Sequence, residues 1–179
     1  FNDASGDQDF RVESNGNTHM LFVDAGNDFV GIGNSTQWGG VLNVTSSDNG
    51  NTLVLASTDT DANVGPILSL YRSSSSSAAD SDFLGRIALQ GLNDANQAVT
   101  YGKIFAQIAD ASDGTEDGIL AFRTVLAGTD TRRIDLGATE TVINEDSADL
   151  DFRVESNGNA NLFKIDANSD SGAGQVICG

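Results

Sequence analysis

The sequence has very few of the side chains from which catalytic and metal centres are commonly built. It contains one cysteine, Cys178, and one histidine, His19, among 179 residues. A single cysteine excludes a disulfide framework within one chain and a zinc site built from cysteines. A single histidine leaves almost nothing for a histidine metal cluster or a histidine-based catalytic triad.

Positive charge is also scarce. Nine Lys and Arg residues stand against 26 Asp and Glu residues, which gives a formal net charge of −17. Such a chain repels the nucleic-acid backbone and anionic lipid. No apolar run approaches the roughly 20 residues that a membrane-spanning helix needs. We therefore expect no nucleic-acid partner and no membrane insertion.

The residues that are abundant favour strands and turns. The chain has 20 Gly and one Pro, with many Asn, Ser and Thr. This composition is typical of a turn-rich β protein. Because no sustained 3.6-residue periodicity is present either, we predict an all-β fold.

The strongest pattern is an internal duplication. Residues 9–17, Asp-Phe-Arg-Val-Glu-Ser-Asn-Gly-Asn, reappear unchanged as residues 151–159. A nine-residue identity does not arise by chance, so a structural unit has been duplicated.

Each copy is predicted to form three short strands. In the first copy these are residues 10–13, 20–24 and 29–32, joined by turns at 14–17 and 25–28. The Asn-Gly and Gly-Asn pairs in these turns are typical of positions with positive φ. In the second copy, a four-residue insertion around 171–174 aligns Val176 and Cys178 with Val30 and Ile32.

The two copies differ at one informative position. The apolar residues Leu21 and Val23 stay apolar in the second copy, whereas Phe22 between them is replaced by Lys164. Alternate residues of a strand face opposite ways. We therefore expect Leu21 and Val23 to point inward, and Phe22 and Lys164 to point outward.

A unit of about 33 residues is too small to bury its apolar face alone. It must stack on neighbouring parts of its own chain or pair with other copies of the chain. We therefore predict self-association through the apolar residues of both repeat copies. These core residues are Phe10, Val12, Leu21, Val23, Phe152, Val154, Phe163 and Ile165.

The predicted organisation has four parts, which are a first repeat unit at 1–33, a linker at 34–40, a central β domain at 41–142 and a second repeat unit at 143–179. Because a repeat opens and closes the segment, we expect the chain to continue beyond Gly179 as a tandem array. The strands expected between the repeats are 41–44, 52–56, 67–72, 83–92, 99–108, 118–126, 132–136 and 140–143.

The central strands follow two hydrophobic patterns. In the strand at 83–92, Phe83, Ile87 and Leu89 are expected on one face, with Arg86 and Gln90 on the other. Residues 67–71 and 119–122 are apolar on both faces, which is typical of strands buried on both sides. This pattern favours a sheet with a core behind it and a partner chain in front.

One turn offers a candidate metal site. Asp110, Asp113, Glu116 and Asp117 lie in a glycine-containing turn, and Ca²⁺ binds carboxylate oxygens. The favoured alternative is a solvated turn without metal, because Asp is a common turn former. Apart from calcium, no cofactor is expected, and no residue set predicts a catalytic site.

The repeat resembles a module found in tail-fibre proteins of tailed bacteriophages, especially those from marine samples. Residues 144–159 and 162–167 carry the resemblance, and the earlier copy, ending at residues 24–33, resembles the module equally. The central segment is similar to domains that lie between such modules. That similarity rests on residues 65–72, 84–87 and 113–118.

The resemblance implies an elongated, intertwined homotrimeric β fibre on the virion, outside the cell and without enzymatic activity in these residues. Its partners would be copies of itself, other virion tail proteins, and a host surface glycan or protein. The expected function is a structural fibre segment that supports attachment to the host receptor. Two alternatives stay open: a cellular surface adhesin or extracellular filament, and a polysaccharide-degrading tailspike.

Overall fold

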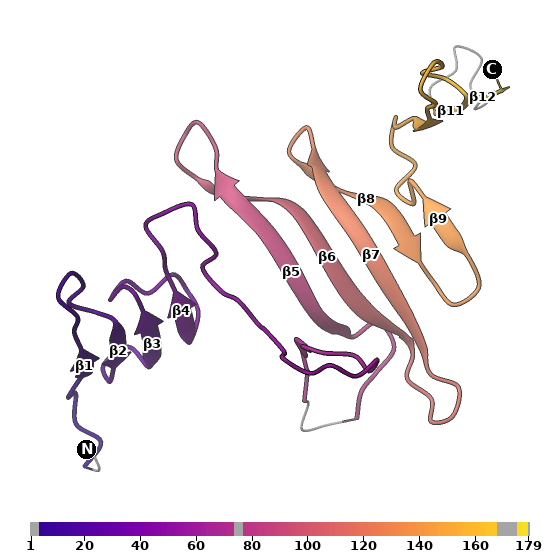
Figure 1. The fold of residues 1–179 in the computed structure, drawn as a ribbon. Helices are drawn as coiled ribbons and strands as arrows, with labels where there is room; N and C mark the ends of the chain where they lie inside the picture. Colours follow the sequence, from indigo (N-terminus) through magenta and orange to yellow (C-terminus); the bar gives the residue numbers. More distant parts are fainter. Residues whose placement is uncertain (1–3, 74–76, 168–174, 179) are drawn as a thin grey trace. The chain divides into compact units, whose positions relative to one another are not determined.

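The computed structural model describes residues 4–73, 77–167 and 175–178. In this part of the chain every regular element is a strand, so the prediction of an all-β fold is confirmed. The strands form three sheets, and the chain divides into two compact units, Phe1–Leu68 and Ser69–Gly179 (Figure 1). None of the described residues belongs to a helix capable of crossing a membrane.

The first sheet contains four strands in the order β1-β2-β3-β4. They are β1 (Phe10–Val12), β2 (Leu21–Asp24), β3 (Phe29–Ile32) and β4 (Leu42–Val44). The first three are antiparallel and match the predicted strands closely, whereas β4 runs parallel to β3. Because β4 completes this sheet, the boundary predicted at residue 41 falls inside it.

Two glycines allow close backbone approaches around β3. A Cβ at Gly31 would clash with the carbonyl oxygen of Asn34, and one at Gly33 would clash with that of Thr45. Gly33 also has a φ of +85°, which L side chains rarely adopt. In the second turn positive φ occurs at Asp28 rather than in the Gly26-Asn27 pair, and in the first turn it does not occur at Gly16.

The second repeat folds with the register of the first. Its strands are β10 (Phe152–Val154), β11 (Phe163–Asp166) and β12 (Gln175–Cys178). Ile165 lies opposite Val176 as Val23 lies opposite Val30, which confirms the alignment of the last strands. The predicted insertion at 171–174 lies outside the described residues.

Several residues that are identical in the two copies make equivalent contacts. Asp9 Oδ1 accepts a hydrogen bond from the Ala25 amide at 3.0 Å, and Asp151 Oδ1 accepts one from Ala167 at 3.1 Å. The Ser-Asn-Gly-Asn turns close in the same way, with a backbone hydrogen bond of 2.8 Å in the first copy and 2.9 Å in the second. The nine-residue identity therefore encodes one loop geometry, used twice.

The Phe22 assignment was wrong for the single chain. The Phe22 side chain is 8% exposed and Phe29 is 3% exposed, with ring centroids 5.9 Å apart. His19 also contacts Phe22 edge-on at 5.2 Å. The face that carries Phe22 is therefore closed locally by His19 and Phe29, whereas Val23 on the other face is 36% exposed. In the second copy, Lys164 replaces the aromatic contact with ion pairs to Asp151 and Asp166, each at 2.8 Å.

The third sheet is an antiparallel meander of five strands that lie side by side in chain order (Figure 1). They are β5 (Phe83–Leu92), β6 (Ala98–Asp110), β7 (Asp117–Leu126), β8 (Thr129–Leu136) and β9 (Thr141–Ile143). All five were predicted, with ends that differ by a few residues at most. The strands predicted at 52–56 and 67–72 are absent, because these segments form no ladder with any described strand.

A bulge corrects the predicted face of Phe83. The register shifts between Phe83 and Gly85, so Leu84 is an extra residue in β5. Phe83 therefore lies on the same face as Arg86, where its ring contacts Phe105 at 5.2 Å between centroids. Alternation through the bulge would have placed Phe83 with Ile87, as the sequence pattern predicted.

Candidate functional site

The first sheet has one face made entirely of apolar side chains. Cross-strand register places four of the predicted core residues together on this face, Phe10 opposite Val23 and Val12 opposite Leu21. The face continues across β3 and β4 with Val30, Ile32, Leu42 and Val44. Phe10, Val12, Ile32 and Leu42 are exposed on this face, and Leu42 is 60% exposed.

The second repeat presents the same kind of face. The register brings together Phe152 with Ile165 and Val154 with Phe163, the other four predicted core residues. Phe152, Val154 and Ile165 are exposed, and Phe163 is half-buried. All eight predicted core residues thus lie on apolar sheet faces, and none of them is buried within the single chain.

The five-stranded third sheet, from here on called the central sheet, also has one face lined by apolar side chains. We call it the apolar face of the central sheet. Cross-strand pairs place Ile87, Ile104, Phe122 and Ile134 in one row across four strands. Leu89, Leu120, Leu136 and Ile143 extend this row. Ile87 is 49% exposed and Leu89 is 63% exposed.

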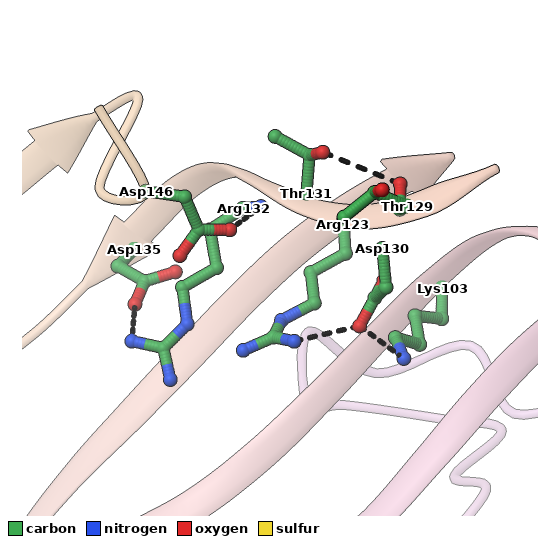
Figure 2. A network of polar contacts seen from close by, with 8 residues as sticks. All are labelled: Lys103, Arg123, Thr129, Asp130, Thr131, Arg132, Asp135 and Asp146. Atoms are coloured by element: carbon green, nitrogen blue, oxygen red, sulfur yellow. Dashed lines mark hydrogen bonds and ion pairs between the residues drawn. The ribbon is translucent and has the colours of Figure 1, made fainter. Parts of the chain in front are cut away.

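The opposite side, the polar face of the central sheet, carries an ion-pair network (Figure 2). Asp130 lies between two cations, with its Oδ2 atom 2.7 Å from both Lys103 Nζ and Arg123 Nη1. Burial alone would raise the pKa of Asp130, but the hydrogen bonds and charges of Lys103 and Arg123 lower this pKa below its ordinary value. The network holds together β6, β7 and the start of β8.

A second set of contacts lies further along β8 (Figure 2). Arg132 Nη1 donates to Asp135 Oδ2 at 3.0 Å, and the Arg132 amide donates to Asp146 Oδ2 at 2.7 Å. Asp135 is 7% exposed, and its Oδ1 atom is buried without a hydrogen-bond partner among the described residues. This contact fixes residue 146, in the segment after β9, against β8.

A cavity of about 390 Å³ opens beside the Asp130 network. Six residues line it: Phe83, Gly85, Arg86, Lys103, Phe105 and Arg123. The guanidinium of Arg123 lies 5.0 Å from the centre of the Phe105 ring, within the range of a cation–π contact. This small cavity brings together three cationic side chains and two aromatic rings.

The predicted calcium turn does not form a ligand cluster in the described structure. Asp110 and Asp117 lie opposite each other at the ends of β6 and β7. However, no group of three or more His, Cys, Asp or Glu side chains within the described ranges could hold a metal ion. Asp110 Oδ1 instead accepts the Ser112 amide at 2.8 Å, and this backbone hydrogen bond lowers the pKa of Asp110.

Sequence reasoning missed the polar face and its cavity. Arg86, Lys103, Arg123 and Arg132 are four of only nine Lys and Arg residues in the chain, and each lies on a predicted strand. That concentration was the available signal. The signal did not reveal that four strands bring these residues to one face, because the pairing register between strands is not readable from one segment, and a bulge in β8 also shifts Arg132.

Comparison of the chain with protein families, curated proteins and solved structures gave no match.

Proposed function

We propose that this chain is a structural segment of a virion tail fibre, which assembles as a homotrimer through the apolar faces of its sheets. One observation carries the proposal: each of the three sheets has an apolar face with exposed side chains among the described residues. Further copies of the chain would supply surfaces that cover these faces.

The physical argument rests on the continuity of these faces. Isolated apolar residues are normal on protein surfaces, but monomeric proteins rarely expose contiguous apolar patches larger than a few hundred Å². In the first sheet, eight apolar side chains cover four adjacent strands without a polar residue among them. Burial of such faces between chains is strongly favourable, at about 25 cal/mol for each Å² removed from water.

The segment between the first and central sheets adds support. This segment includes the two stretches predicted as strands, 52–56 and 67–72. Their apolar side chains are more than 60% exposed at Leu53, Val54, Ile67 and Leu68. Extended apolar segments without a partner in their own chain are suited to pairing with another copy. Exchange of this kind is what an intertwined fibre requires.

The resemblance of the repeat to phage tail-fibre modules gives this assembly its proposed setting, outside the cell on a virion. There the segment would connect other tail proteins to the part that attaches to a host surface glycan or protein. A cellular adhesin or filament would use the same apolar faces, and the genes beside the coding sequence distinguish these two settings. A glycan-cleavage assay tests the tailspike alternative.

Sedimentation equilibrium of the 179-residue chain tests the assembly. We expect a mass three times the 18.6 kDa of one chain at micromolar concentration. Leu89→Asp should dissociate the particle, because this side chain is 63% exposed on the apolar face of the central sheet.

Gln90→Asp is the matched control. It adds one negative charge on the same strand, at an exposed residue on the opposite face, and should leave the trimer intact. A folded wild-type monomer of 18.6 kDa under these conditions would refute the proposal. Equal dissociation by the control would assign the effect to charge rather than to the apolar face.

A further inference from the structure

The cavity on the polar face of the central sheet has a charge opposite to that of the chain. The chain has a net charge of −17, yet the cavity is lined by Arg86, Lys103 and Arg123. Asp130 is the carboxylate that forms ion pairs with two of these cations, Lys103 and Arg123. Three cations therefore face one carboxylate, which leaves a local excess of positive charge.

Arg86 has no carboxylate partner among the residues that the structure describes. It is exposed on β5, directly opposite Phe105 on β6. An arginine can donate two parallel hydrogen bonds to a carboxylate, sulfate or phosphate group. Arg86 is thus the cavity cation with its hydrogen-bonding groups available to a ligand.

The apolar part of the lining gives the cavity a second recognition element. Phe105 is 5% exposed and packs edge-on against Phe83, so its ring is held in place. The guanidinium of Arg123 lies over Phe105, and its Nη1 atom donates to Asp130 Oδ2 at 2.7 Å. The lining is therefore preorganised, and its volume lies within the range of about 300–1,000 Å³ typical of small-molecule sites.

We propose that this cavity binds a monosaccharide-sized organic anion, with the anionic group on Arg86 and the ring of the ligand beside the Phe83–Phe105 pair. Lys103 and Arg123 form ion pairs with Asp130. Their positive charges still attract an anionic ligand electrostatically, without a direct hydrogen bond to it. The cavity opens on the face opposite the row of apolar side chains proposed for assembly. Its role is independent of the trimer, and its failure would leave the fibre proposal unaffected.

Titration of the 179-residue chain with glucuronate, followed by saturation-transfer NMR and calorimetry, tests this site. Glucose is the matched neutral ligand, because it has the same ring without the carboxylate. We expect saturable binding of glucuronate, no saturable binding of glucose, and weaker glucuronate binding as salt concentration rises.

Arg86→Gln should weaken glucuronate binding at least about tenfold, which is the effect of losing one charge-assisted hydrogen-bond partner. Arg11→Gln is the control, since Arg11 is an exposed arginine in the first sheet and carries the same charge. Circular dichroism should show both variants folded. The proposal is wrong if glucuronate does not saturate, if glucose binds equally well, or if the two variants lose affinity equally.

Discussion

Phe22→Lys is the most informative substitution in the first repeat, because the second repeat already carries Lys164 at the equivalent position. The sequence pattern predicts almost no effect, on the assumption that Phe22 points outward. The structure predicts a clear loss of stability, because the Phe22 ring is buried against Phe29 and His19.

The expected loss follows from three contributions. Exposure of a buried Phe side chain costs about 2 kcal/mol, and loss of its aromatic pairing costs about 1 kcal/mol more. A lysine at this position can reach Asp9 and Asp24, as Lys164 reaches Asp151 and Asp166, but such partly exposed ion pairs return about 1 kcal/mol at most. The net decrease in the free energy of unfolding is therefore about 2 kcal/mol.

Urea unfolding measures this decrease. Circular dichroism follows the unfolding, because Trp38, the single tryptophan of the chain, is 70% exposed and its fluorescence would change little. Protomer concentration must be equal in all samples, because self-association shifts apparent stability. Phe22→Leu is the control for burial without the ring contacts, and should lose about 1 kcal/mol.

An unchanged urea midpoint for Phe22→Lys would refute the burial argument. Phe22→Lys combined with Phe29→Gln gives a further test, since Gln175 stands at the position of Phe29 in the second copy. If the two rings interact, the double variant should lose less than the sum of the single variants, by about 1 kcal/mol.

Two further predictions concern a close backbone contact and an ion-pair network. Gly31→Ala should destabilise the first sheet by more than about 1 kcal/mol, because the added Cβ would meet the Asn34 carbonyl oxygen. Gly16→Ala is the control and should be nearly neutral, because a Cβ at Gly16 has open space around it. The urea midpoints of the two variants are compared, and equal midpoints would contradict the close contact at Gly31. The lowered pKa of Asp130 means that its carboxylate stabilises the folded state above the unfolded pKa of about 3.9, and that this stabilisation is lost as pH falls through the lower folded pKa. Asp130→Asn should therefore be less stable than the wild type at pH 7, and the difference should shrink towards pH 3; a difference that is constant with pH would exclude this linkage.

Much of the fold could be predicted because it depends on local pattern. The duplicated loop repeats its contacts, such as Asp9 with Ala25 and Asp151 with Ala167, because identical short-range sequence favours identical turns. The strands of the central meander follow from β-favouring runs separated by turn residues. The segments at 52–56 and 67–72 show the limit of this reasoning, because a strand also needs a neighbouring strand.

The sequence by itself determined the all-β class, the duplication and the apolar rows, because these depend on composition and on a two-residue period. Only the tertiary structure decided which sheet face each of these side chains lies on and whether it is buried. Phe22 is buried because His19, which precedes β2, and Phe29, which begins β3, pack against its ring. Phe83 lies on the other face than expected because Leu84 is an extra residue in β5. The cavity beside Asp130 is likewise tertiary, since Arg86, Lys103 and Arg123 come from three strands whose register no single segment specifies.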